Sequence, residues 1–271
     1  MKKLLFILLT LNTTAFAKLN IIVSIQPQLE FISKIAGDRV SSSLMVQAGD
    51  SPHTYEPKPS QMKNISNANL YFAIGVEFEQ VWLDKFKTQN RKLIVKDITK
   101  DINKTEGQHS LDPHVWVDPI NVKIMAKNIC SILIEQDSKN SKYYKENLNS
   151  YLQELDKTNM EIKEILKKLP SGSTFMVFHP SWGYFAKRYN LTELAVEVDG
   201  KSPKMKALMM IIKKAKEQKV HAIFTQPEFS EKSAKIIANS LDIPIIKASP
   251  LASNWAENLK RLAKAIANEK E

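Results

Sequence analysis

The chain has 271 residues, a quarter of them charged, and a formal net charge of +10. Its only cysteine is Cys130, which excludes a disulfide bond within the chain. The basic residues are spread along helix-like segments and mixed with glutamates, as in residues 213–217, which is typical of a solvated surface, so we expect no nucleic-acid partner.

Residues 1–17 predict a secretory signal peptide. Lys2 and Lys3 precede an apolar segment at residues 4–11 and a small-residue cleavage site at residues 15–17. The apolar segment is shorter than the about 20 residues of a transmembrane helix, which disfavours a membrane anchor. We expect cleavage between Ala17 and Lys18 and a periplasmic product. The residue after the cut is Lys18 and not a cysteine that could accept a lipid, so we expect no membrane attachment.

The remaining chain alternates apolar segments of strand length with segments of helical period, which predicts an α/β protein with two parallel sheets. Cys130 falls in a helical segment, residues 124–133, and is expected to be buried. The expected strands are residues 19–25, 40–46, 70–74, 93–98, 175–178, 194–198, 222–225 and 244–247. The expected helices include residues 27–36, 59–68, 180–189, 203–218, 230–241 and 256–267.

A long helix is predicted between the two sets of strands. Residues 141–169 contain no Gly or Pro and carry apolar residues at helical spacing, so a helix of about 29 residues would be roughly 43 Å long. A coiled-coil partner helix is the alternative interpretation. We expect an N-terminal metal-binding lobe at residues 18–140, this linking helix, and a C-terminal metal-binding lobe at residues 170–271.

Three of the five histidines lie in loops stiffened by proline. His53 stands in Ser-Pro-His-Thr-Tyr-Glu-Pro after an expected strand, His114 in Asp-Pro-His-Val-Trp-Val-Asp-Pro, and His179 between a strand and Pro180. Ligands of open parallel sheets bind beyond the carboxyl ends of strands, where His53 and His179 are expected. Three imidazoles and a fourth ligand complete a tetrahedral zinc shell, in this case a shell built by tertiary structure.

An isolated loop histidine is more often a surface or structural group, and spacing alone favours that interpretation. We expect His221, at the amino end of a strand, to be structural and His109 to be exposed.

The three histidine motifs together resemble those of the zinc and manganese substrate-binding proteins of ABC transporters, the cluster A-I metal-binding family. The resemblance extends in order over the whole mature chain. It implies two Rossmann-like lobes joined by a backbone helix, with Zn²⁺ held in the cleft between them by His53, His114 and His179. It also implies delivery to a permease and its ATPase by a protein that we expect to be a monomer. Manganese-binding members tend to carry a carboxylate at the third position, so His179 favours zinc.

The chain departs from the family pattern at two places. Many relatives have Asp-Pro-Leu where this chain has Ser249-Pro250-Leu251, and a serine hydroxyl is a poor zinc ligand. Water, Glu56 or Glu228 is therefore a candidate fourth or supporting group, with Ser249 itself the weakest. The stretch before the second ligand, residues 97–112, holds one histidine in place of a histidine-rich loop, so we expect weak metal scavenging there.

Two other functions remain as alternatives to zinc transport. Three histidines and a zinc-bound water also describe a hydrolase site, with Glu56 as the candidate general base. We expect no enzyme, because Glu56 can equally orient a ligand. Adhesion is the second alternative, and the absence of a lipid-anchor cysteine argues against it. Manganese is the alternative cargo.

Overall fold

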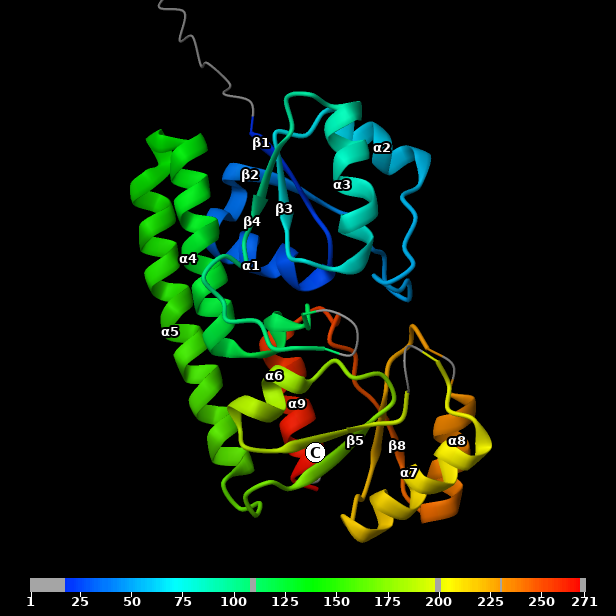
Figure 1. The fold of residues 1–271 in the computed structure, drawn as a ribbon. Helices are drawn as coiled ribbons and strands as arrows, with labels where there is room; N and C mark the ends of the chain where they lie inside the picture. The colour runs from blue at the N-terminus through cyan, green and yellow to red at the C-terminus, as the bar shows by residue number, and fades with distance from the viewer. Residues whose placement is uncertain (1–17, 108–110, 198–200, 230, 269–271) are drawn as a thin grey trace, which may run out of the picture.

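The computed structural model describes residues 18–107, 111–197, 201–229 and 231–268. The expected signal peptide and His109 lie outside the described residues. Two four-stranded parallel sheets, each with helices, form two lobes stacked along a pair of long helices (Figure 1). This arrangement confirms the predicted α/β class with two parallel-sheet lobes and a long helix.

The first lobe is built on a sheet with the strand order β2-β1-β3-β4. All four residues of β3 are buried, as expected for a parallel strand covered on both faces. The prediction omitted α3, whose charged residues weaken its helical pattern. The elements are β1 (Leu19–Val23), α1 (Gln26–Ala36), the 3₁₀ turn η1 (Gly37–Arg39), β2 (Val40–Leu44), α2 (Pro59–Ser66), β3 (Leu70–Ala73), α3 (Glu77–Gln89) and β4 (Ile94–Asp97).

The second lobe repeats the topology of the first, with the strand order β6-β5-β7-β8. The central strands β5 and β7 pair in parallel, as β1 and β3 do in the first lobe. In each sheet, the loops that follow the two central strands therefore leave from the same edge. The elements are β5 (Thr174–Val177), α6 (Gly183–Arg188), β6 (Thr192–Ala195), α7 (Met205–Glu217), β7 (Ile223–Thr225), α8 (Lys232–Leu241), β8 (Ile245–Lys247) and α9 (Trp255–Ile266).

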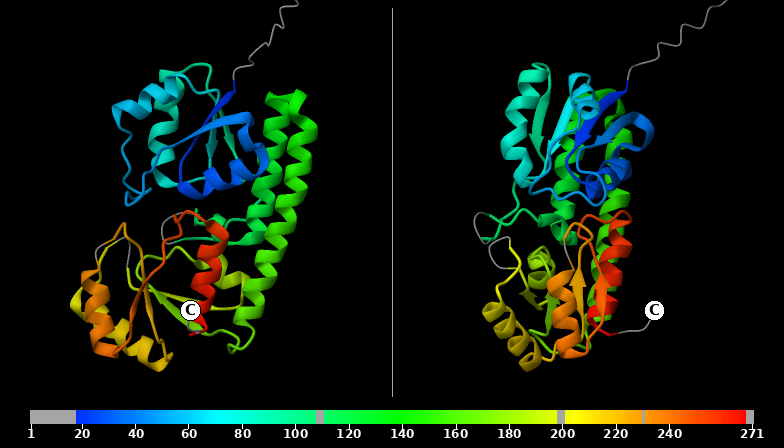
Figure 2. Two further views of the ribbon diagram at one scale, coloured as in Figure 1. Left: turned by 180° about the vertical axis from the view of Figure 1, so that it is seen from behind. Right: turned by 90° about the vertical axis from the view of Figure 1, so that its right-hand side faces the viewer.

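The linking helix α5 spans Ser141–Leu166, or 26 residues, and ends before the predicted boundary at residue 169. Pro170 has no N–H to donate to the Leu166 carbonyl oxygen and disfavours helical geometry at Leu169, so the helix stops before the predicted boundary. α5 packs against α4 (Pro119–Gln136); α5 runs along both lobes, whereas α4 lies beside the first lobe (Figure 2). The partner helix considered for α5 is therefore present within the chain itself. The 3₁₀ turn η3 (Ser138–Asn140) joins the two helices.

A continuous apolar core joins the lobes through the linking helices. It includes Phe31 of α1, Tyr151 of α5, and Trp182 and Trp255 of the second lobe. A separate, smaller cluster around Met176 and the helices α7 and α8 fills the outer part of the second lobe. The inner part of that lobe is thus packed onto the linking helices, whereas its outer part has its own core.

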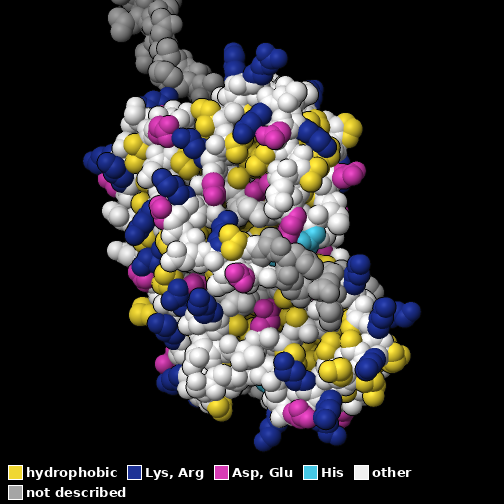
Figure 3. Space-filling view, in the orientation of Figure 1, with side chains coloured by type: hydrophobic (Ala, Val, Ile, Leu, Met, Phe, Trp, Pro, Cys, Tyr) yellow, Lys and Arg dark blue, Asp and Glu magenta, His cyan; other side chains and the backbone are white. Residues whose placement is uncertain are grey.

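The surface and the single cysteine agree with the composition. Lys and Arg side chains are scattered over the face seen in Figure 3 and do not gather into one basic area. Cys130 is 3% exposed within α4, as expected of a core residue. Within the described ranges, no helix combines the length and the apolar character that crossing a bilayer requires.

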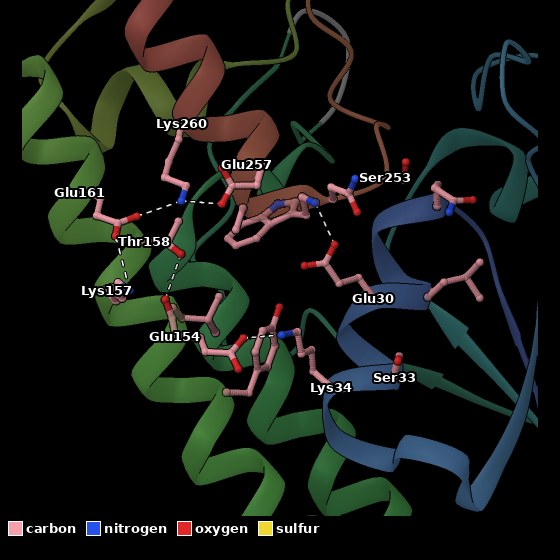
Figure 4. A pocket seen from close by; sticks show the side chains of 17 residues that line it. Glu30, Ser33, Lys34, Glu154, Lys157, Thr158, Glu161, Ser253, Glu257 and Lys260 are labelled. Carbon is pink, nitrogen blue, oxygen red and sulfur yellow. Dashed lines mark hydrogen bonds and ion pairs between the residues drawn. The ribbon is translucent and has the colours of Figure 1, made fainter. Parts of the chain in front are cut away.

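A groove of about 650 Å³ lies where α1, α5 and the start of α9 meet (Figure 4). Its walls carry ion pairs, including Lys34 with Glu154 at 2.5 Å and Lys260 with Glu161 at 3.0 Å. Glu30 of α1 accepts a hydrogen bond from the backbone N–H of Trp255 at 2.8 Å, so the first lobe caps the first turn of α9. Its charged groups pair with one another or, as Glu30 does, with the backbone, and these contacts link α1, α5 and α9 at the junction of the lobes.

Candidate metal centre

The structure brings His53, His114 and His179 together at the junction of the lobes. One nitrogen from each ring can be chosen so that all three lie within 4.8 Å of one another. The Nε2 atoms of His53 and His179 are 3.0 Å apart. His114 and His179 are buried, at 8% and 9% exposure, while the side chain of His53 is 28% exposed. The three rings converge on a point that is shielded except on the side of His53.

Each histidine is positioned by a different local device. His179 follows β5, and the side chain of Gln226 donates to its carbonyl oxygen at 3.2 Å. His53 lies in the loop between β2 and α2, where Ser51 Oγ accepts a hydrogen bond from the His53 backbone N–H at 3.3 Å. His114 precedes the 3₁₀ turn η2 (Val115–Val117), and its backbone N–H donates to Asp112 Oδ1 at 2.9 Å. The backbone of the site is therefore held from both lobes.

The segment that carries His114 is also held by the second lobe. Tyr184 of α6 donates its hydroxyl hydrogen to the carbonyl oxygen of Asp112 at 3.0 Å and accepts from the backbone N–H of Thr105 at 2.9 Å. Arg188 of α6 donates to both carboxylate oxygens of Asp118, at 2.8 to 3.0 Å, and Asp118 caps α4. These bonds fix His114 relative to the lobe that supplies His179.

A carboxylate faces Nδ1 of every one of the three rings. Glu77 lies 3.1 Å from His53 Nδ1, Asp112 lies 2.7 Å from His114 Nδ1, and Glu197 forms a short hydrogen bond with His179 Nδ1. When Nδ1 donates to a carboxylate, Nε2 is the nitrogen left with a lone pair. Such carboxylate–histidine pairs orient metal-binding imidazoles and raise their basicity. All three rings thus present Nε2 as the donor atom.

The electrostatic balance differs between the buried and the half-buried ring. Burial opposes protonation of His53, but its hydrogen bond and charge interaction with Glu77 outweigh burial, so the pKa of His53 is raised. Burial lowers the pKa of His179, and the neighbouring His114 and His53 reinforce this against the bond to Glu197. Burial raises the pKa of Glu77, but His53 outweighs it and the net shift is downward. The site therefore favours an ionised Glu77 and a neutral His179.

The space between the rings is small and opens into a larger acidic entrance. The inner cavity measures about 20 Å³, close to the about 10–15 Å³ that holds one water-sized sphere. The three histidines, Glu77 and Glu228 are among its walls. An outer cavity of about 620 Å³ adds Glu106, Asp112, Glu193 and Glu197. Figure 3 shows a histidine side chain at the surface between the lobes, with acidic side chains beside it.

One carboxylate oxygen at the inner cavity has no hydrogen-bond partner. Glu77 Oε2 is buried and unpaired among the described residues, while Glu77 Oε1 faces His53. A buried acceptor without a donor is unfavourable by about 1–3 kcal/mol. A water molecule that donates to Glu77 Oε2 relieves that penalty, and the charge of the carboxylate favours a cation nearby. The donor set and the unpaired oxygen both fit a divalent cation.

The other residues named from the sequence lie at different distances from this cavity. Glu228 lines both cavities and accepts a hydrogen bond from Ser249 Oγ at 3.1 Å. Glu56 is exposed and lines neither cavity. His221 is placed to bond the carbonyl oxygen of Ala265 at 3.3 Å, away from the site.

Sequence patterns did not identify the carboxylates that face the Nδ1 atoms of the three histidines, or the aromatic side chain that stacks on His179. Phe229 stacks on the His179 ring, with centroids 4.6 Å apart and planes at 18°. Asp112 carried a usable signal, because it stands two residues before His114 in the same motif. Glu77, Glu197 and Phe229 carried none, since each is distant in sequence from the histidine that it contacts.

Comparison with known proteins agrees with the fold and with metal binding. The model of the family described as zinc-uptake complex component A, periplasmic (ZnuA), matches residues 21–269. The chain belongs to this family, the cluster A-I metal-binding proteins that serve ABC transporters as substrate-binding components. Such proteins work with a permease and an ATPase.

Individual relatives are similar over nearly the whole chain. A crystal structure of ZnuA is 41% identical with a TM-score of 0.90, and the match covers 93% of this chain and 99% of that chain. A structure of a ZnuA deletion mutant with zinc bound is also 41% identical, with a TM-score of 0.88 and coverage of 93% and 98%. The manganese ABC transporter substrate-binding lipoprotein PsaA of Streptococcus anginosus is 30% identical, covering 86% of this chain and 80% of the relative. The relatives therefore include proteins named for zinc and for manganese.

Proposed function

We propose that this protein captures Zn²⁺ in the periplasm and delivers it to an ABC-type zinc importer. The observation that carries the proposal is the convergence of three histidines whose Nδ1 atoms all face carboxylates. Three preoriented Nε2 donors suit zinc, which accepts imidazole readily in a tetrahedral shell. His53, His114 and His179 are the proposed ligands.

A site in which three of the donor atoms are imidazole nitrogens favours zinc over manganese. Manganese prefers hard oxygen ligands, and affinity for nitrogen sites rises from Mn²⁺ towards Zn²⁺. Manganese remains the second candidate cargo, because a relative that is 30% identical is named for manganese.

A zinc hydrolase is disfavoured by the position of its candidate base. General-base catalysis requires a group within about 2.6–3.2 Å of the proton that it removes, or one water away. Glu56 is exposed and outside both cavities. We therefore propose that the protein acts in transport and has no enzymatic activity.

The proposed division of the chain follows from the ligand positions. An N-terminal lobe of residues 18–140 supplies His53 and His114, and a C-terminal lobe of residues 170–271 supplies His179. The segment 141–169 links them, mostly as α5. Processing after Ala17 and a monomeric periplasmic form complete the proposal.

Competitive metal titration tests this function. The purified chain, stripped with a chelator, is titrated with Zn²⁺ and with Mn²⁺ against a metal indicator. We expect one tightly bound zinc per chain and much weaker manganese binding. His53→Ala, His114→Ala and His179→Ala should each weaken zinc binding strongly, whereas the matched control His221→Ala should leave it unchanged. Tighter binding of manganese than of zinc would refute the choice of cargo.

A further inference from the structure

We propose that Glu228 is the fourth ligand of the transported ion and that the hydroxyl of Ser249 holds it in place. The inference rests on the proposed function, because it completes the shell begun by the three histidines. In the structure, Glu228 borders the same inner cavity as all three rings. Its carboxylate supplies the oxygen donor that the three-histidine set lacks.

The first step excludes the carboxylates that face Nδ1. The two nitrogens of an imidazole point in divergent directions, so a carboxylate bonded to Nδ1 is directed away from an ion on Nε2 of the same ring. Glu77, Asp112 and Glu197 are therefore committed to orienting their histidines.

The second step compares what remains around the inner cavity. Among its described lining residues, the only carboxylates are Glu77 and Glu228. The amide of Gln226 is engaged with the backbone of His179 and with Ser181 Oγ, at 3.2 and 2.8 Å for its two donated bonds. Glu228 is thus the one carboxylate at this cavity that orients no histidine.

The third step concerns how Glu228 is held. Ser249 Oγ donates to Glu228 Oε1 at 3.1 Å and accepts from the backbone N–H of Leu251 at 3.1 Å. The accepted bond fixes the direction of the hydroxyl, so its hydrogen points at Glu228. The Ser249 hydroxyl therefore holds the carboxylate of Glu228, which lies in a neighbouring loop.

The carboxylate has to shift to reach the ion. Glu228 is not among the groups whose donor atoms lie within 4.8 Å of one another. It lies in the loop that follows the buried strand β7 and precedes Phe229, which stacks on His179. A rotation of the Glu228 side chain brings one oxygen towards the rings while the other stays near Ser249. The first lobe then supplies two ligands and the second lobe two.

Cobalt substitution of the full chain tests this assignment, because the visible spectrum of Co²⁺ reports the number and kind of its ligands. Glu228→Gln should alter the cobalt spectrum and weaken zinc binding by at least about tenfold, the lower end of what losing a supporting residue already does. Glu217→Gln is the matched control, since Glu217 is exposed on α7 and lines neither cavity.

A rescue experiment separates ligation from a structural effect. The double variant Glu228→Gln with Ser249→Asp has a carboxylate at position 249, next to the one that was removed. Its zinc affinity should recover. Thermal unfolding of the chelated variants checks that each is folded. An unchanged cobalt spectrum and unchanged zinc affinity in Glu228→Gln would overturn the assignment and leave the three-histidine site standing. Absence of tight zinc binding by the unaltered chain would remove the proposed function itself.

Discussion

Trp255 donates its indole N–H to the carbonyl oxygen of Trp116 at 2.7 Å, and Trp116 in turn donates to the carbonyl oxygen of Pro250 at 2.9 Å. The two tryptophans tie the segment that follows His114 to the segment that leads into α9. The Trp116 ring also lies beside the His114 ring, with centroids 5.2 Å apart. Trp116 thus contributes both to the surroundings of the metal centre and to the junction of the lobes.

Trp255→Phe should destabilise the chelated protein by about 1–3 kcal/mol, because the Trp116 carbonyl is left buried without its donor. Urea unfolding followed by circular dichroism measures the free energy of unfolding. Trp82→Phe is the matched control. Trp82 is half-buried on α3, and Lys85 Nζ lies 4.0 Å from the centroid of its ring. A loss for Trp255→Phe no larger than for the control would mean that the hydrogen bond contributes nothing.

Removing the charge behind His179 should weaken zinc binding without removing a ligand. Glu197→Gln keeps a hydrogen-bond acceptor but loses the negative charge that raises the basicity of the ring. The expected loss of zinc affinity is about 10- to 100-fold. Indicator competition measures it, with Asp156→Asn as control, since Asp156 pairs with Lys123 on the exposed surface. Equal affinities for the two variants would contradict an orienting role for Glu197.

The stability of the chelated protein should fall as pH rises from about 4.5 to about 7. Burial raises the pKa of Glu79 from 4.5 to about 7, although Ser24 and the backbone N–H groups of Ile74 and Gly75 bond its carboxylate. A carboxyl whose pKa is higher in the folded state favours folding when protonated, so its contribution is full below the unfolded pKa. It declines up to the folded pKa, by roughly 3 kcal/mol in all.

Urea unfolding of the chelated chain between pH 5 and pH 8 checks this slope. Glu193, whose pKa burial also raises to about 7, contributes in the same direction. Glu79→Gln should therefore flatten the pH dependence without abolishing it. A variant as steep as the parent chain would show that Glu79 does not titrate in this range.

Glu30→Ala should loosen the junction of the lobes at the start of α9. Asn254, the residue before α9, makes no capping hydrogen bond with its own side chain, and Glu30 takes that role for Trp255. Loss of a helix cap typically destabilises a protein by about 1 kcal/mol. Thermal unfolding measures the loss, and Glu154→Ala is the control, because its exposed ion pair with Lys34 contributes little. Equal losses would argue against the capping role.

The sequence predicted those parts of the fold that depend on local pattern. The alternation of apolar segments located both sheets, and the absence of Gly and Pro located α5. The end of α5 was misplaced by three residues. Apolar spacing continues to Leu169, but Pro170 disfavours helix in the turn that precedes it. The packing of α4 against α5 was missed, because a pattern within one helix does not specify its neighbour.

The candidate site was only partly accessible from the sequence. Proline-flanked loops after strands singled out His53 and His179, and the family resemblance added the grouping with His114. The pairing of His53 with Glu77 and of His179 with Glu197 depends on how loops from separate strands meet. The same limit applies to Glu228 and Ser249, which are 21 residues apart and bonded through space.

The small volume of the inner cavity sets a condition on any ion that enters. A space of about 20 Å³ admits a bare ion but not one surrounded by its shell of waters. The incoming ion must therefore give up its hydration at the acidic entrance, where carboxylates replace the departing waters. Mg²⁺ dehydrates reluctantly and prefers to keep several waters. The narrow chamber thus disfavours Mg²⁺, which would have to give up the waters that it normally keeps in protein sites.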